Sequence, residues 1–259
     1  AMAIQKLNQI LDHAPNSDKI IFYLGAIYEE IKEYDVAINY FSRIPVSRSY
    51  YSESILHGSY LLKLQGKPEQ AAAMVEKALG NNSDNVQFYV LYASYANELK
   101  QFDKAAKVLA DGVQRLPQDS QLHFYLGTMQ DRLGDRTGLI ASMKKPLSLD
   151  ENHVQAMNYL AYTYAELNLE LGNAESLARQ AVTLKPNDGY ILDTLGWVLY
   201  KKGRVDEAVK ILESAFQLQP SESIIAEHLG DAYLKSQLPD RAKKMYLIAA
   251  ENETDEKKV

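Results

Sequence analysis

The sequence predicts an all-α protein made of seven helical hairpins in a row, preceded by half a hairpin. Small residues recur about every 34 positions, a second series rich in Ala follows the same period, and apolar residues keep helical spacing. The first series is Gly25, Ser59, Ala93, Gly127, Ala161, Gly196 and Gly230. The second series is Ala37, Ala71, Ala105, Leu139, Ala174, Ala208 and Ala242.

Each unit is expected to contain two helices joined by a short turn. In the first unit, Ile21, Leu24 and Tyr28 share one helical face with Gly25. Turns are expected at 66–68, 134–135, 172–173, 203 and 238–240. Acidic residues are expected to open and cap the second helices, namely Asp35, Asp103, Asp206 and Asp240.

Three departures from the period predict an irregular region. Pro45 should shorten the second helix of the first unit, and Pro146 falls inside the second helix of the fourth. One extra residue lies between Ala161 and Ala174. We therefore expect a local change of superhelix pitch around residues 138–172.

Composition and motifs argue against several classes of function. The 259 residues are 46% hydrophobic and 24% charged, with a net charge of −6 and no cysteine. This balance is typical of a globular chain and disfavours nucleic-acid binding. The sequence has no membrane-span or signal-peptide pattern, no catalytic or phosphate-binding motif, and only scattered histidines. It therefore predicts no enzyme, no catalytic or metal site, no cofactor and no insertion into a membrane.

The unit resembles a tetratricopeptide repeat, which has 34 residues, small residues at its eighth and twentieth positions, and Pro near its end. Repeats would begin at Asp18, Ser52, Val86, Ser120, Val154, Gly189 and Ser223 and extend over residues 18–251. The resemblance implies a right-handed α-α superhelix. Residues 1–17 should hold a vector-derived Ala1-Met2 and the second helix of a truncated repeat, and 252–259 a polar tail.

Two short strings, 196–200 and 227–230, are similar to the C-terminal repeats of bacterial envelope lipoproteins of this family. They favour a periplasmic or lipid-anchored location in a bacterial cell envelope. A cytoplasmic location is the alternative.

Stacked repeats form a curved solenoid that binds partners on its concave surface. In the resembled family the first helix of each repeat lines this groove. The candidate groove residues are Phe22, Tyr23, Tyr60, Phe124, Tyr125, Asn158, Tyr159, Tyr162, Tyr190, Asp193, Trp197 and Tyr200. Most are aromatic, and exposed aromatic patches mark interaction sites. Trp197 could instead belong to the core, and both interpretations stay open at this point.

Charged residues on the same face predict the character of the partner. Nine are acidic: Glu29, Glu30, Glu53, Glu98, Asp131, Glu166, Asp193, Glu227 and Asp231. Five are basic: Lys19, Lys63, Arg132, Lys201 and Lys235. A mildly acidic, aromatic groove suits a protein or peptide that carries apolar and basic side chains.

The sequence thus predicts a non-catalytic scaffold or adaptor that binds a protein or peptide in its groove. Two other functions are open. The chain could be the substrate-recruiting arm of a larger enzyme, or an assembly factor that forms homo-oligomers through the ends of its solenoid.

Overall fold

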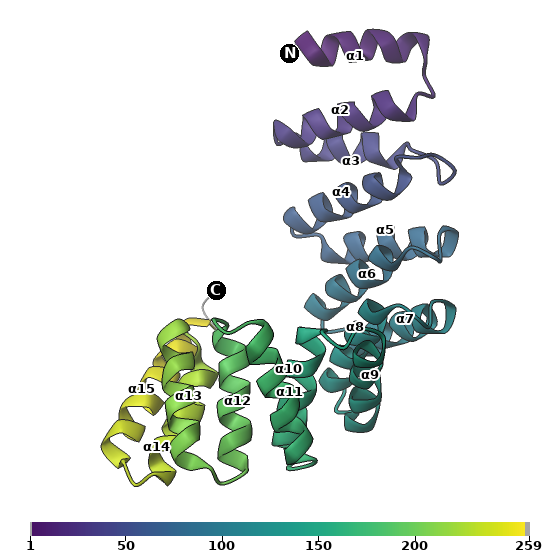
Figure 1. Cartoon of the computed structure of the whole chain (residues 1–259). Coiled ribbons are helices and arrows are strands. Elements are labelled where there is room, and N and C mark those ends of the chain that lie inside the picture. Colours follow the sequence, from purple (N-terminus) through teal and green to yellow (C-terminus); the bar gives the residue numbers. More distant parts are fainter. Residues whose placement is uncertain (1, 257–259) are drawn as a thin grey trace. The chain divides into compact units, whose positions relative to one another are not determined.

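The computed structural model describes residues 2–256, and all regular elements in this range are α-helices (Figure 1). The first eight are α1 (Met2–His13), α2 (Asp18–Glu30), α3 (Tyr34–Ser42), α4 (Tyr51–Leu64), α5 (Pro68–Asn81), α6 (Val86–Glu98), α7 (Phe102–Arg115) and α8 (Ser120–Arg132). The others are α9 (Arg136–Leu149), α10 (Val154–Glu166), α11 (Leu171–Leu184), α12 (Gly189–Lys201), α13 (Val205–Leu218), α14 (Ser223–Lys235) and α15 (Pro239–Glu256).

From α2 onward the helices alternate as the first and second helices of seven repeats, and α1 is the preceding single helix. The all-α repeat architecture predicted from the sequence is therefore confirmed. The chain divides between Leu139 and Ile140, inside α9, into two compact units. This division lies within the segment 138–172 for which an irregularity is predicted.

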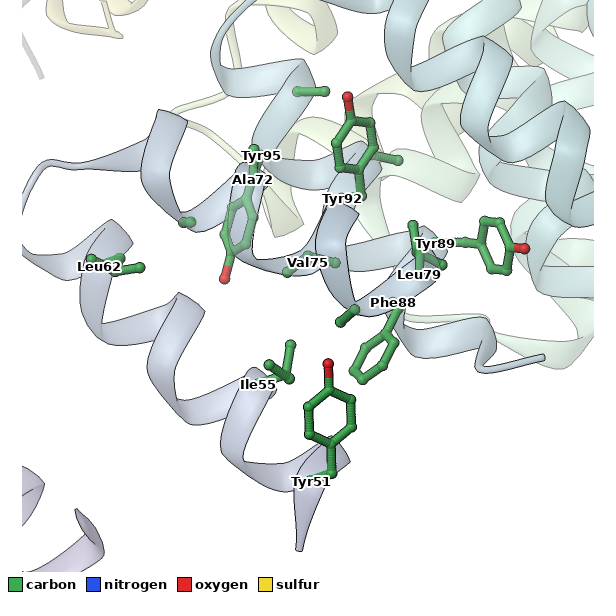
Figure 2. Close-up of a cluster of buried hydrophobic side chains, with 14 of the residues drawn as sticks. Tyr51, Ile55, Leu62, Ala72, Val75, Leu79, Phe88, Tyr89, Tyr92 and Tyr95 are labelled. Atoms are coloured by element: carbon green, nitrogen blue, oxygen red, sulfur yellow. The ribbon is translucent and has the colours of Figure 1, made fainter. Parts of the chain in front are cut away.

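Tyrosines account for much of the core of the first unit. Tyr89, Tyr92 and Tyr95 lie on successive turns of α6 and are buried (Figure 2). The ring of Tyr51 on α4 meets that of Phe88 edge-on, with centroids 6.5 Å apart. Three α6 tyrosines thus contribute to packing and leave little surface for a partner.

A buried polar contact joins two neighbouring hairpins of this unit. The Tyr95 hydroxyl on α6 donates to the Ser59 hydroxyl on α4 across 3.2 Å. Both residues are buried, and burial raises the pKa of the Tyr95 hydroxyl. Each hydroxyl thereby satisfies a polar group that would otherwise be costly to bury.

Small residues permit close crossing of the two helices in a hairpin. A Cβ placed on Gly196 of α12 would lie 2.6 Å from Cγ of Leu212 on α13. Ala208, the small residue of α13, is completely buried. The periodic small residues are therefore explained by helix contact.

The turns between paired helices share a left-handed residue, which is Gly66, Gly134 or Gly203 in three hairpins. In other hairpins the same turn holds Lys32, Lys100, Asn168 or Gln237 at positive φ. The inserted residue of the fifth repeat lies in the turn 167–170, where Glu170 is a second left-handed residue. The expected turn at 172–173 is wrong, because both residues belong to α11.

The predicted acidic caps are also placed differently. Asp35, Asp103, Asp206 and Asp240 lie in the first turns of their helices, beyond the N-cap position. There their carboxylates interact favourably with the positive end of the helix dipole, but they do not cap the helix. Side-chain caps occur instead on first helices, where Asp119 accepts from Leu122 N and Asp188 accepts from Tyr190 N and Ile191 N.

Pro45 has the effect that its position predicts, whereas Pro146 does not end its helix. Helix α3 has nine residues whereas α5 has fourteen, and Pro45 follows just after α3. Helix α9 continues past Pro146 to Leu149. At the C-terminal end, α15 includes residues 252–256 of the expected polar tail, while Ala1 and 257–259 lie outside the described residues.

Candidate protein-interaction surface

The second unit contains a stack of rings on its first helices. The imidazole of His228 (α14) lies parallel to the indole of Trp197 (α12), with centroids 4.0 Å apart. The ring of Tyr200 stacks on the same indole at 4.8 Å and 6°. Tyr162 of α10 approaches His228 at 6.1 Å. We call Tyr162, Trp197, Tyr200 and His228 the aromatic platform.

The repeat period brings these residues together. Tyr162 and Trp197 each occupy the ninth position of their repeat, 35 residues apart, and His228 is at the sixth position of the next. Because consecutive first helices lie side by side, residues at similar positions meet across them. Contacts of α12 with both α10 and α14 bear this out.

Charged side chains hold the platform in place. Trp197 Nε1 donates to Glu166 Oε1 at 2.7 Å, and the Lys201 ammonium is 3.7 Å from the same oxygen. Lys201 lies 4.7 Å from the centroid of the Trp197 ring, and Lys235 lies 4.5 Å from that of Tyr200. Cations over aromatic faces are stabilising. The protein's own lysines therefore already occupy positions that a basic ligand group would seek.

A buried pair lies beside the platform. His228 Nδ1 is 2.9 and 3.0 Å from the two carboxylate oxygens of Asp193. Both side chains are almost fully buried, and burial raises the pKa of the Asp193 carboxyl despite the opposing hydrogen bond from His228. The carboxylate therefore orients the imidazole in its stack on Trp197.

The predicted groove residues of this unit differ in exposure. Asp193 and Trp197 are buried, at 4% and 7% exposure, and so present little surface to a partner. Tyr190 is 45% exposed. The remainder are half-buried: Asn158, Tyr159, Tyr162 and Tyr200. Asn158 Oδ1 is itself buried and makes no hydrogen bond within the described part of the chain.

The first unit has a separate aromatic group near its N-terminal end. Phe22 stacks on Tyr50 at 4.9 Å and meets His57 edge-on at 5.7 Å, and Tyr23 lies 6.3 Å from Tyr50. The hydrogen bond with Tyr23 raises the pKa of the Tyr50 hydroxyl. His57 Nδ1 also contacts Glu29 Oε2 at 2.7 Å. Tyr23 remains 42% exposed, so this group keeps an accessible ring.

The other predicted residues of the first unit lie apart from this group. Tyr60 on α4 is 53% exposed. Phe124 and Tyr125 on α8 are half-buried and meet edge-on at 5.7 Å. The twelve predicted residues are therefore distributed over several groups, and each group lies within one unit.

Sequence reasoning missed Tyr50, His57 and His228 as members of these groups. A signal existed for the two histidines. Both occupy the sixth repeat position, which holds Tyr23, Tyr125 and Tyr159 in other repeats. An imidazole at this position takes the place of a phenol ring. Tyr50 lies in the irregular loop after α3, where the repeat pattern does not apply.

Many charges that define the acidic face have internal partners. Glu29 pairs with His57, Glu98 with Lys63, and Glu166 with Lys201. Asp131 pairs with Arg136, and the Tyr246 hydroxyl donates to Asp231 at 2.6 Å. The negative charge available to a partner in the second unit is concentrated on exposed residues such as Glu227.

Within residues 2–256 the structure holds neither a metal-binding cluster nor a membrane-spanning helix. Among the described residues, no group of three or more His, Asp or Glu side chains is arranged to hold a metal ion. None of the helices within 2–256 has both the length and the apolar character needed to cross a membrane.

The chain is similar in sequence to the TPR repeat-containing protein PA4667 of Pseudomonas aeruginosa, with 26% identity over 215 residues. The match covers 83% of the chain but 36% of that relative. In structure it is similar to a tetratricopeptide repeat protein from Parabacteroides merdae, with a TM-score of 0.68, 16% identity, and coverage of 91% of this chain and 93% of that one.

A second similar structure is YrrB, described as a TPR protein with an unusual peptide-binding site. It gives a TM-score of 0.54 and 17% identity over 71% of this chain and 94% of YrrB. Two family models described as tetratricopeptide repeat match residues 62–124 and 98–259. The chain belongs to the tetratricopeptide repeat family, and in general terms it is a protein-interaction scaffold.

Proposed function

We propose that the chain is a non-catalytic adaptor that binds a peptide segment of another protein on the first helices of its second unit, in the concave groove expected there. The observation that carries the proposal is the aromatic platform, with Tyr190 exposed on the same helix as Trp197. Rigid aromatic side chains supply large contact areas at low entropic cost and are enriched in binding hot spots.

The chemistry of the surface favours a partner with apolar and basic side chains. Tyr190 is exposed, Tyr162 and Tyr200 are half-buried, and Glu227 is an exposed carboxylate on α14. Lys201 and Lys235 cover two ring faces in the free protein. An incoming Arg or Lys would displace them from the rings, whereas apolar side chains would pack beside them.

A displayed library of random peptides, selected on the purified protein, tests the proposal. Enriched peptides should carry aromatic or aliphatic residues together with Lys or Arg. Fluorescence polarisation then gives their affinities for the wild-type protein, Tyr162→Ala and Tyr190→Ala. Each substitution should weaken binding about tenfold or more, as truncation of a hot-spot residue does.

Leu247→Ala is the matched control. Leu247 is 55% exposed on α15, a second helix, and should not contribute to the groove. Peptides that bind all first-helix variants as well as wild type, and that lose affinity for Leu247→Ala, would contradict the proposal.

Two other functions remain proposals. A larger enzyme could use the chain as a recruiting arm, since the Pseudomonas relative is much longer than the matched region. Self-association through the ends of the solenoid is favoured by exposed Ile10 on α1 and exposed Leu234 on α14. Light scattering over a concentration series tests the self-association.

We also propose a bacterial envelope location, which cell fractionation of the native host would test.

A further inference from the structure

The early end of α3 leaves a cavity on a face of the first unit that the peptide proposal does not use. A regular second helix has fourteen residues, as α5 does, and α3 has nine. At 1.5 Å per residue the missing five correspond to about 7.5 Å of helix. A cavity of about 560 Å³ lies between α3, the loop after it, α4 and α5.

The lining of the cavity is mainly hydrocarbon. Ile38 and Phe41 come from α3, Val46 from the loop, Ile55 from α4 and Met74 from α5. The cavity volume falls in the range of ligand sites of about 300–1,000 Å³. An apolar cavity of this size favours a ligand that brings a hydrocarbon surface of its own.

Polar groups lie along one side of the same cavity. Gln70, Lys77 and Asn81 are exposed residues of α5, spaced so that they share one helical face with Ala73. No carboxylate of the described residues forms an ion pair with Lys77. The Lys77 ammonium is therefore available to an anionic group at the edge of an apolar site.

The charge around the cavity is positive although the chain is acidic. An adjoining cavity of about 280 Å³ shares Pro45 with the first and is lined by Arg43 and Arg48. Of the described residues that line the two cavities, Asp18 alone is acidic. Three cations against one anion favour a ligand of opposite charge.

We propose that this cavity binds a medium-chain fatty acid, with the hydrocarbon chain inside and the carboxylate at Lys77. A partner helix fits less well, because anchors at i and i+7 are about 10.5 Å apart and the gap is about 7.5 Å long. A single hydrocarbon chain is flexible and can bend to fit within a cavity of about 560 Å³. The proposal concerns a different surface from the peptide site and does not depend on it.

Displacement of the fluorescent fatty acid 11-(dansylamino)undecanoate tests the proposal with octanoate and decanoate below their critical micelle concentrations and with decanol below its solubility limit. The probe should bind once per chain. Affinity should rise about fourfold for each methylene buried between octanoate and decanoate. Decanol should bind about tenfold more weakly than decanoate, because it lacks the charge-assisted contact with Lys77.

Two variants with matched controls locate the site. Lys77→Gln should remove the preference for decanoate over decanol, whereas Lys107→Gln on α7 should keep it. Ala73→Trp should fill the cavity and abolish probe binding, and Ala110→Trp on α7 should not. All four residues are exposed, so circular dichroism should show an unchanged fold.

Three results would overturn the proposal. One is probe binding that Ala73→Trp leaves intact. Another is equal affinity of the wild-type protein for decanoate and decanol. The third is sedimentation of the protein with vesicles of anionic phospholipid while free decanoate fails to displace the probe, which would indicate a membrane-binding surface.

Discussion

The imidazole of His228 lies flat against the indole of Trp197, with ring centroids 4.0 Å apart and planes 12° from parallel. The two residues come from α14 and α12, the first helices of adjacent hairpins. Asp193 is hydrogen-bonded to the imidazole, and Glu166 accepts a hydrogen bond from the indole. Residues from three hairpins therefore meet at this contact. The same residues thus stabilise the second unit and form part of the surface that we propose for the partner.

Replacement of Trp197 by Ala should therefore affect folding as well as binding. Loss of this buried side chain should lower the free energy of unfolding by about 3 kcal/mol. Trp197→Phe keeps a ring but loses the hydrogen bond to Glu166, and should cost about 1 kcal/mol. Urea unfolding followed by circular dichroism measures both. An unchanged urea midpoint for Trp197→Ala, with reduced peptide affinity, would instead make Trp197 a binding anchor.

The Asp193–His228 pair should show strong coupling. Asp193→Ala leaves a buried imidazole without its partner and should cost about 3 kcal/mol of stability. A double-mutant cycle with His228→Ala should give an interaction energy of about 1 kcal/mol or more. The half-exposed pair His57–Glu29 serves as the comparison, with a smaller expected coupling. Additive effects at Asp193 and His228 would show that their contact contributes nothing.

Glu175 predicts a pH dependence in the acidic range. The carboxylate contacts Lys202, Arg179 and Arg204, and these cations, Lys202 first, lower its pKa from 4.5 to about 2. A lowered pKa in the folded state means that its stabilisation is complete above the unfolded pKa and is lost as the pH falls from about 4.5 toward 2.

At pH 7, Glu175→Gln should thus reduce stability by about 1–2 kcal/mol, and the difference from wild type should shrink below pH 4.5. Urea titrations at pH 7, 5, 4 and 3 measure this trend. Glu76→Gln, an exposed carboxylate on α5, should show a much smaller effect throughout. A wild-type advantage that stays constant down to pH 3 would rule out the ion-pair explanation.

The left-handed turns predict a stabilising substitution. Lys100 has φ of 55°, a conformation that glycine adopts without steric cost. Lys100→Gly should raise the free energy of unfolding by up to about 1 kcal/mol. The reverse change at the equivalent turn, Gly203→Ala, should lower it by about 1 kcal/mol, since Gly203 has φ of 79°. Thermal unfolding provides the measurement, and a destabilised Lys100→Gly would contradict the argument.

The 34-residue period correctly predicted most of the helix positions. Six first helices begin at the residue where a predicted repeat begins, and α4 begins one residue earlier, at Tyr51. The period succeeds because small residues are required wherever paired helices cross. It fails at the inserted turn 167–170, because an insertion can be placed anywhere between two periodic positions.

The candidate site was less predictable. Repeat positions assigned all twelve residues to first helices, but they could not show that Asp193 and Trp197 are buried. Burial of Trp197 depends on the ring of His228, which comes from the next repeat and breaks the local pattern of aliphatic and phenolic residues. Contacts between repeats depend on which two residues meet, whereas the repeat period predicts only the position of each single residue.

The hydrogen bond from Tyr95 to Ser59 bears on how freely such hairpins can be exchanged. Its donor and acceptor come from different hairpins, so a change in the order of the hairpins would leave two hydroxyl groups unpaired in the hydrophobic core. Sequences that look like copies of one motif are thus matched to their own neighbours, and a chimera assembled from them in another order should fold poorly unless such pairs move together.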